Sequence, residues 1–346
     1  MELVRAALAG DRRAVARLIT RIENNCEDVQ NELAELYPYA GRAYVIGVTG
    51  APGAGKSTLV GQLAKAYRAS QPKVGVVAVD ATSPFSGGAI LGDRIRMRDL
   101  AGDPGIFVRS MATRGNLGGL ASTTAEVVKV LDAVGYDPII VETVGTGQAE
   151  VDIARLAHTV LVVEAPNMGD EIQALKAGIL EIADILVVNK CDCVGAERTS
   201  AALEMMLNLD RAGGSFHDML CSSLALLTGP PQPATALAAG KAADADAGNR
   251  WRPRLIKTNA LQGEGIPDLV QAIADHRQYL EASQELQRRD WVRVMHELEQ
   301  TLYQALMKRL LDGIDPAHLT NLLARVVARE IDPYAAVRQL IAQCWS

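Results

Sequence analysis

The stretch from Gly50 to Ser57 reads G-A-P-G-A-G-K-S and fits the phosphate-loop pattern G-x-x-x-x-G-K-[ST] at every fixed position. Glycines let such a loop curl so that its backbone N–H groups meet phosphate oxygens at the start of a helix. In that arrangement Lys56 reaches the β- and γ-phosphates, and the Ser57 hydroxyl holds Mg²⁺. The sequence therefore predicts a nucleotide-binding loop made of Gly50, Ala51, Pro52, Gly53, Ala54, Gly55, Lys56, Ser57 and Thr58.

A second motif, Asn189-Lys190-Cys191-Asp192, has the N-K-x-D pattern of a guanine site. The Asp192 carboxylate can accept hydrogen bonds from both N1–H and the 2-amino group of guanine. Adenine has no donor at either place and would leave a buried carboxylate unpaired, which is costly. The Lys190 stem is expected to lie along the base, and a backbone N–H of Asn259, Ala260 or Leu261 to contact the guanine oxygen. These residues predict GTP and GDP as ligands.

Three carboxylates stand at strand ends or in loops on the phosphate side of the predicted sheet, namely Asp80, Asp93 and Glu142. Mg²⁺ prefers octahedral oxygen coordination and keeps several waters. The carboxyl ends of parallel strands gather at one edge of a sheet, which places the three acids near the phosphate loop. We predict that one or two of them bind Mg²⁺ together with Ser57, directly or through water.

The run Glu142-Thr143-Val144-Gly145 is similar to the D-x-x-G element of GTPases, with Glu in place of Asp. The Gly145 N–H is expected to contact the γ-phosphate and so to sense hydrolysis. Gln148 is expected to orient the attacking water. Together with Lys56 and Asp93, these residues would act mainly by positioning and charge neutralisation. No built-in arginine finger or strong base is visible in the sequence, so we expect the protein alone to turn over slowly.

These motifs need a parallel sheet to bring them together, and the chain alternates strand and helix patterns from residue 44 to about residue 192. Short runs rich in Val, Ile and Leu are typical of strands buried on both faces. The predicted strands are Tyr44–Thr49, Val74–Asp80, Ile106–Ser110, Pro138–Glu142, Thr159–Glu164, Ile185–Asn189 and, later, Arg254–Thr258. The predicted helices between the earlier strands are Leu59–Ala69, Leu120–Val134 and Glu171–Ile182. The fold class is α/β, a P-loop NTPase with a mostly parallel central sheet.

Helical extensions are predicted on both sides of this core. Residues 1–41 form an N-terminal helical extension, in which Gly10-Asp11 supplies a break and a helix N-cap. Residues 42–281 form the nucleotide-binding domain, with an Ala-, Gly- and Asp-rich insertion at about 211–249. Residues 282–346 form a C-terminal helical extension whose later helices begin at Asp-Pro pairs.

Composition excludes several classes of protein. The chain has 346 residues, 49% of them hydrophobic, which allows a sizeable core. Its net charge of −6 argues against a general affinity for nucleic acid. Its five cysteines are too few and too scattered for a secreted disulfide scaffold. No apolar run reaches the roughly 20 residues of a membrane span, and the first residues lack the apolar core of a secretion signal. We expect a cytoplasmic protein without nucleic-acid or membrane partners.

The combined motifs resemble the MeaB/ArgK family of GTPase chaperones, relatives of the methylmalonic aciduria type A protein. The runs that carry the resemblance are Leu8–Thr20, Gly47–Thr58, Asp80–Pro84, Gly92–Met97, Arg109–Gly115 and Glu142–Gln148. Two positions depart from the family pattern: Cys191 stands where Ala is usual, and Asn259 stands where Ser is usual. The 211–249 stretch is also longer than the short link expected in this family.

The resemblance implies a P-loop GTPase of the SIMIBI class that forms a homodimer through its C-terminal helices. It implies that Asp80, Asp93 and Glu142 serve around Mg²⁺. It also implies a nucleotide- and partner-responsive switch with the residues Asp170, Glu171, Gln173 and Lys176. Family members use GTP to gate the loading of adenosylcobalamin onto an acyl-CoA mutase and to protect and reactivate that mutase. The cobalamin belongs to the mutase, which stimulates the GTPase.

Several alternatives remain open at this stage. A nickel-type metallochaperone GTPase would need a Cys/His cluster near the phosphate loop, and Cys191-x-Cys193 has no spaced partners to complete one. A transport-linked kinase or ATPase would bind adenine, against the Asp192 prediction. A scaffold would bind GTP without turnover. Methylmalonyl-CoA mutase is the default partner, with isobutyryl-CoA, 2-hydroxyisobutyryl-CoA and ethylmalonyl-CoA mutases also open.

Overall fold

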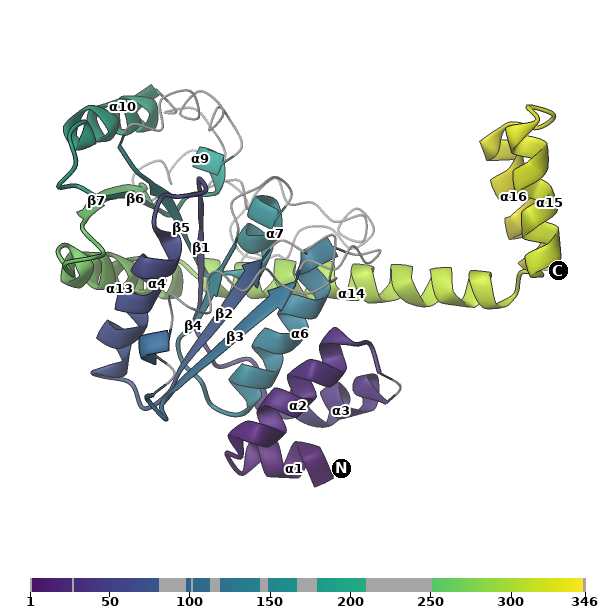
Figure 1. Cartoon of the computed structure of the whole chain (residues 1–346), viewed down its shortest axis with the longest axis horizontal. Coiled ribbons are helices and arrows are strands. Elements are labelled where there is room, and N and C mark those ends of the chain that lie inside the picture. Colours follow the sequence, from purple (N-terminus) through teal and green to yellow (C-terminus); the bar gives the residue numbers. More distant parts are fainter. Residues whose placement is uncertain are drawn as a thin grey trace, which may run out of the picture. The chain divides into compact units, whose positions relative to one another are not determined.

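The computed structural model describes residues 2–26, 28–80, 98–100, 102–112, 119–143, 149–166, 179–209 and 251–344. The chain divides into two compact units, Met1–Val294 and Met295–Ser346. Figure 1 shows the first unit as a central sheet with helices around it. Within the described ranges, none of the helices combines the length and the apolar character that crossing a membrane requires.

Seven strands form one sheet in the order β3-β2-β4-β1-β5-β6-β7, and every neighbouring pair is parallel. The strands are β1 (Val45–Gly50), β2 (Val74–Asp80), β3 (Ile106–Ala112), β4 (Ile139–Glu142), β5 (Thr159–Glu164), β6 (Ile185–Asn189) and β7 (Arg254–Thr258). The predicted parallel α/β fold is therefore confirmed. Strand β1 lies at the centre, between β4 and β5, so the phosphate loop that follows it leaves from the middle of the carboxyl edge.

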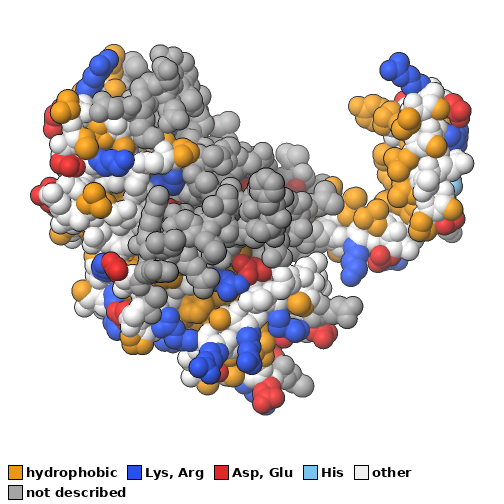
Figure 2. All heavy atoms as spheres, in the orientation of Figure 1, with side chains coloured by type: hydrophobic (Ala, Val, Ile, Leu, Met, Phe, Trp, Pro, Cys, Tyr) orange, Lys and Arg blue, Asp and Glu red, His pale blue; other side chains and the backbone are white. Residues whose placement is uncertain are grey.

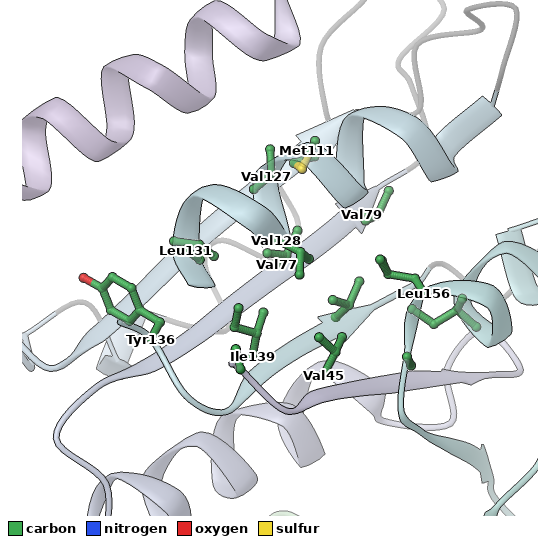
Figure 3. Packing of buried hydrophobic residues seen from close by; sticks show 14 of the residues in the cluster. Val45, Val77, Val79, Met111, Val127, Val128, Leu131, Tyr136, Ile139 and Leu156 are labelled. Carbon is green, nitrogen blue, oxygen red and sulfur yellow. The ribbon is translucent and has the colours of Figure 1, made fainter. Parts of the chain in front are cut away.

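Helices cover both faces of the sheet because alternate strand residues point to opposite sides. On one face, Ile46 and its neighbours pack against α4 (Lys56–Arg68) and α13 (Ile266–Ala282). On the other, Val45 and its neighbours pack against α6 (Gly119–Ala133) and α7 (Ala149–Leu156). Figure 3 shows the second face, where the labelled side chains of β1, β2 and β4 meet those of α6 and α7. The described residues between β2 and β7 also form α9 (Ile179–Ile182), α10 (Ala196–Leu209) and the short η2 (Arg98–Leu100).

The predicted N-terminal extension consists of α1 (Glu2–Leu8), α2 (Arg12–Glu23), α3 (Val29–Leu36) and η1 (Tyr37–Tyr39). Asp11 caps α2 by accepting a hydrogen bond from the Arg13 N–H, as its position after Gly10 predicts. The guanidinium of Arg12 donates to the backbone oxygens of Asp103, Pro104 and Ile106 at 3.3, 2.9 and 2.8 Å. This arginine therefore fastens the extension to the start of β3.

Within the first unit, a buried ion pair joins the first turns of α14 (Glu285–Asp312) to the sheet. Arg289 donates from Nη1 and Nη2 to the two carboxylate oxygens of Asp184, at 2.9 and 2.8 Å. Both side chains are about 8% exposed, so water screens their attraction little. His276 of α13 lies against the same carboxylate, at 3.3 Å, and its Nδ1 is 2.8 Å from the Thr159 hydroxyl. The pair joins α13, α14 and the amino ends of β5 and β6.

The buried imidazole of His276 predicts a loss of stability in mild acid. Burial lowers the pKa of His276 from 6.5 to about 4. The ring is therefore neutral in the folded chain at every pH above about 4. Below pH 6.5 the unfolded chain binds a proton that the folded chain rejects, and the free energy of unfolding falls until about pH 4. At about 1.4 kcal/mol per pKa unit the loss is about 3 kcal/mol. Urea unfolding between pH 7 and pH 4 measures it.

The variant His276→Asn serves as the reference for that measurement, because Asn keeps a polar contact to Thr159 but does not titrate. We expect a flatter pH dependence of unfolding for the variant than for the wild type between pH 6.5 and pH 4. Parallel curves for the two proteins would contradict the assignment to His276.

The second unit contains the later part of α14, from Met295, together with α15 (Pro316–Val327) and α16 (Pro333–Cys344). Asp315 caps α15 by accepting from the Ala317 N–H, as the Asp-Pro pattern predicts. Many large apolar side chains of these helices are exposed, and Figure 2 shows hydrophobic atoms gathered on them.

Candidate functional site

The phosphate loop is shaped by β5 and by the guanine motif as well as by its own glycines. Gly50 has φ +130°, and a Cβ there would lie 2.0 Å from the Val163 backbone oxygen. Gly55 is the N-cap of α4 with φ +92°, and a Cβ there would lie 2.4 Å from Nδ2 of Asn189. A side chain at either position would collide with neighbouring groups that build the site. The two fixed positions of the motif, Gly50 and Gly55, therefore require glycine for steric reasons.

Two hydrogen bonds fix the side chain of Lys56 inside the phosphate loop. Its Nζ donates to the backbone oxygens of Gly50 at 2.8 Å and Ala51 at 3.0 Å, and the residue is only 6% exposed. An ammonium group fixed at this place, in the first turn of α4, adds its charge to the partial positive charge of the helix N-terminus. The positive electrostatic potential at the loop therefore favours the binding of a polyphosphate.

The predicted partners Ser57 and Glu142 meet beside this loop. The Ser57 hydroxyl donates to Oε1 of Glu142 at 2.7 Å, and both residues are buried. Glu142 ends β4, in register with Val48 of the central strand. A hydroxyl and a carboxylate side by side are oxygen ligands of the kind that Mg²⁺ prefers, so these residues fit the ion.

Two features of the site have no counterpart in the predicted set. The Thr143 hydroxyl donates to the Thr49 hydroxyl at 2.9 Å, and both residues are fully buried. This bond joins the segment after Glu142 to the segment before Gly50. Glu164, which is 1% exposed, ends β5 next to the phosphate loop. The available signal was its position, since Glu164 ends a buried apolar strand just as Glu142 does.

Asn189 ties the guanine motif to the phosphate loop. Its Nδ2 donates to the Ala54 backbone oxygen at 2.8 Å. Its Oδ1 accepts from the Thr258 hydroxyl at 3.2 Å and from the Ala260 N–H at 3.1 Å. One amide therefore joins the three segments from which we predicted nucleotide contacts.

The other residues of the guanine motif lie around this junction. Lys190 adopts φ +57° and donates from Nζ to the Gly53 backbone oxygen at 2.9 Å. The Cys191 N–H donates to the backbone oxygen of Thr258 at 3.0 Å. Asp192 is exposed, as a residue that meets a ligand must be. The following segment is mixed, since Asn259 and Ala260 are buried whereas Leu261 is 82% exposed.

Several predicted residues lie outside the described part of the chain. They are Asp93, Gly145, Gln148, Asp170, Glu171, Gln173 and Lys176. Asp80 ends β2 as predicted, but its side chain is not among those described. Of the predicted helix Glu171–Ile182, the structure describes Ile179–Ile182 as α9. The predicted insertion at 211–249 also falls outside the described ranges.

The described residues contain no group of three or more His, Cys, Asp or Glu side chains arranged to hold a metal ion. Burial, then the nearby Glu264 and Asp192, raises the pKa of the Cys191 thiol, which disfavours the thiolate that binds soft metals. The pair Cys191 and Cys193 thus gives no support to the nickel-type alternative.

Known proteins are similar to this chain over most of its length. A family model described as methylmalonyl-CoA mutase-associated GTPase MeaB matches residues 15–315. A protein of Pyrococcus abyssi named as a GTPase is 41% identical over 342 residues, which cover 99% of this chain and 96% of that protein. The mitochondrial methylmalonic aciduria type A homolog of Mus musculus is 33% identical over 244 residues, or 70% of this chain and 51% of that protein. The solved structure of a LAO/AO transport system kinase matches with 26% identity and a TM-score of 0.64, covering 100% of this chain and 97% of that one.

Proposed function

Because the chain belongs to the MeaB family of methylmalonyl-CoA mutase-associated GTPases, we propose that it is a cytoplasmic chaperone of an adenosylcobalamin-dependent acyl-CoA mutase. GTP binding sets the conformation of the switch segments. Hydrolysis times the loading of adenosylcobalamin and the protection and reactivation of the mutase. The partner is methylmalonyl-CoA mutase or a related enzyme of the 2-hydroxyisobutyryl-CoA or isobutyryl-CoA type, and the cobalamin is bound by that partner.

The observation that carries the nucleotide assignment is the junction at Asn189. Its amide contacts Ala54 of the phosphate loop and Ala260 of the segment after β7. These two hydrogen bonds support a phosphate site and a base site that lie next to each other, with the exposed Asp192 proposed to contact the base. A carboxylate at that place pairs with N1–H and the 2-amino group of guanine and rejects adenine.

Hydrolysis in this proposal depends on position and charge. Lys56 neutralises the β- and γ-phosphates from its fixed place in the loop. When Mg²⁺ is bound it supplies charge stabilisation to the phosphates, and Ser57 and Glu142 are the described residues that would hold it. Asp80 and Asp93 are proposed to help hold the ion, Gly145 to contact the γ-phosphate, and Gln148 to orient water.

Replacing the base-reading carboxylate tests the guanine assignment. We expect Asp192→Asn to weaken GDP binding about 100-fold, because the amide presents a donor to the donor edge of guanine. Xanthosine diphosphate carries a carbonyl in place of the 2-amino group and should bind the variant better than GDP does. Calorimetric titration of both nucleotides into both proteins measures this exchange. An unchanged preference for GDP would refute the assignment.

The partner assignment is tested with the purified mutase. We expect the mutase to bind the tagged chain and to raise its rate of GTP hydrolysis several-fold. With Lys56→Ala, loading of adenosylcobalamin onto the mutase should lose its dependence on GTP. A scaffold would instead keep its effect on the mutase in that variant, and absence of binding to any of these mutases would contradict the proposed partner.

The second unit is proposed to join two copies of the chain. Apolar side chains that are at least 45% exposed are Leu298, Leu302, Tyr303, Leu306, Leu311, Leu323, Val327, Tyr334 and Val337. Such a surface is unusual for a monomer and typical of an interface. Light scattering should give twice the chain mass for the wild type and a lower mass for Val327→Asp. A monomeric wild type at micromolar concentration would contradict the proposal.

A further inference from the structure

We infer that a hydrogen bond between two buried hydroxyls, those of Thr49 and Thr143, positions the Glu142 carboxylate for Mg²⁺. The inference rests on the proposed function, from which it takes the role of Glu142 at the ion. It adds two positioning residues, which act through the placement of that carboxylate.

The first support is the presence of hydroxyls where the neighbouring strand positions carry apolar side chains. Thr49 is fully buried and Thr143 is 1% exposed. Valine has nearly the same shape as threonine and needs no hydrogen-bond partner, and these strands use it at Val45, Val48 and Val141. Burying a hydroxyl has a desolvation cost that its hydrogen bond offsets, and valine at both positions would avoid that cost. This choice of residues indicates a role for the bond beyond stability.

The second support is the place of the bond at the end of the strand pair. The ladder between β1 and β4 has Val48 opposite Glu142 as its last pair. Beyond it, the Thr143 N–H donates to the Val48 backbone oxygen at 3.0 Å, and the Thr143 hydroxyl donates to that of Thr49 at 2.9 Å. Strand β4 has only four residues and Glu142 is the last of them, at a place where strands fray. The two bonds therefore fix the residue directly after the carboxylate.

The third support is that the hydroxyl pair and the Glu142 carboxylate lie on opposite faces of the sheet. The carboxylate faces α4, from which it accepts a hydrogen bond at 2.7 Å. Thr49 shares the other face with Gly47, where an added Cβ would lie 2.6 Å from Ile153 of α7. Thr143 reaches the same face, since its hydroxyl is bonded to that of Thr49. The pair is therefore placed to act on the ion through Glu142 and not as a ligand.

The Mg²⁺ dependence of nucleotide binding tests this inference. Calorimetry measures the affinity for the non-hydrolysable GTP analogue GppNHp over a series of free Mg²⁺ concentrations, and the midpoint of this dependence reports the affinity for the ion. We expect Thr143→Val to move the midpoint to about fivefold higher Mg²⁺, because it removes a buried hydrogen bond. Thr49→Val should move it equally. The double valine variant should move it no further, since each single variant already removes the same bond.

Three variants separate the hydrogen bond from other effects. Thr143→Ser keeps a hydroxyl and should keep the wild-type midpoint. Thr124→Val makes the same substitution in α6, at a residue that is 2% exposed and whose hydroxyl has no hydrogen-bond partner among the described residues, and should also keep it. The double variant Thr49→Val, Thr143→Val leaves neither hydroxyl of the pair behind and should melt close to the wild type. Its shifted midpoint is then a property of folded protein.

An unchanged midpoint in the double valine variant would overturn the inference, and so would an equal shift in Thr124→Val. A weaker affinity at every Mg²⁺ concentration, with the midpoint in place, would also overturn it, because the pair would then be merely structural. Glu142→Gln distinguishes these outcomes from failure of the proposed function. If Glu142→Gln moves the midpoint and the threonine variants do not, the inference alone fails. If Glu142→Gln leaves the midpoint in place, the proposed role of Glu142 at Mg²⁺ fails and the inference fails with it.

Discussion

Replacing Lys56 with alanine should lower kcat/KM for GTP by about 1,000-fold, which corresponds to about 4 kcal/mol of transition-state stabilisation. The ammonium group is already 2.8 Å from the Gly50 oxygen and 3.0 Å from the Ala51 oxygen, and it is nearly buried. Little reorganisation is needed when a polyphosphate enters, so most of its electrostatic effect acts on the reacting phosphates. Single-turnover hydrolysis of GTP in excess Mg²⁺ measures the loss.

Lys65→Ala is the matched control, because Lys65 lies on the same helix and is exposed at its far end. It removes the same charge from the chain and should leave hydrolysis within about twofold, since exposed charges are screened by water and salt. A comparable loss in both variants would show that net charge is responsible. An unaffected Lys56→Ala would remove the phosphate loop from the mechanism.

The sheet could be predicted from sequence because each parallel strand is buried on both faces and therefore appears as a short continuous apolar run. Residues Ile185–Val188 illustrate this, since every one of them is fully buried in β6. The pairing of Ser57 with Glu142 could also be expected, because both follow from motifs whose strands lie side by side. In these cases the local sequence pattern is enough to predict where the residue lies in the fold.

Contacts between distant segments could not be predicted in this way. The Thr49–Thr143 hydroxyl pair depends on the register between β1 and β4, which no single segment encodes. The contact of the Asn189 amide with Ala54 and Ala260 depends on how β1, β6 and β7 are placed in the sheet, which the motif itself does not encode. A motif gives residue types at a spacing, whereas satisfaction of buried polar groups is a property of the assembled site.

The pair of Asp184 and Arg289 supplies the second large prediction, on stability. Asp184→Ala should lower the free energy of unfolding of the first unit by about 3–5 kcal/mol, because the Arg289 guanidinium is left buried without its counter-ion. The Val160 N–H, which donates to the same carboxylate at 2.8 Å, also loses its acceptor. Urea unfolding followed by the fluorescence of Trp251, whose indole N–H donates to the Asp184 backbone oxygen, measures the change.

Two control variants separate the effect of breaking an ion pair from the effect of leaving one buried charge without its partner. Asp275→Ala breaks an ion pair with Arg254 whose side chains are 30% and 49% exposed, and should cost less than about 1 kcal/mol. The double variant Asp184→Leu, Arg289→Met removes both charges and should recover most of the stability lost in Asp184→Ala, because the cost arises from one uncompensated buried charge rather than from the missing attraction. If the double variant were as unstable as the single one, the loss would lie in the hydrogen bond that Asp184 accepts from the Val160 N–H, and not in the uncompensated charge of Arg289.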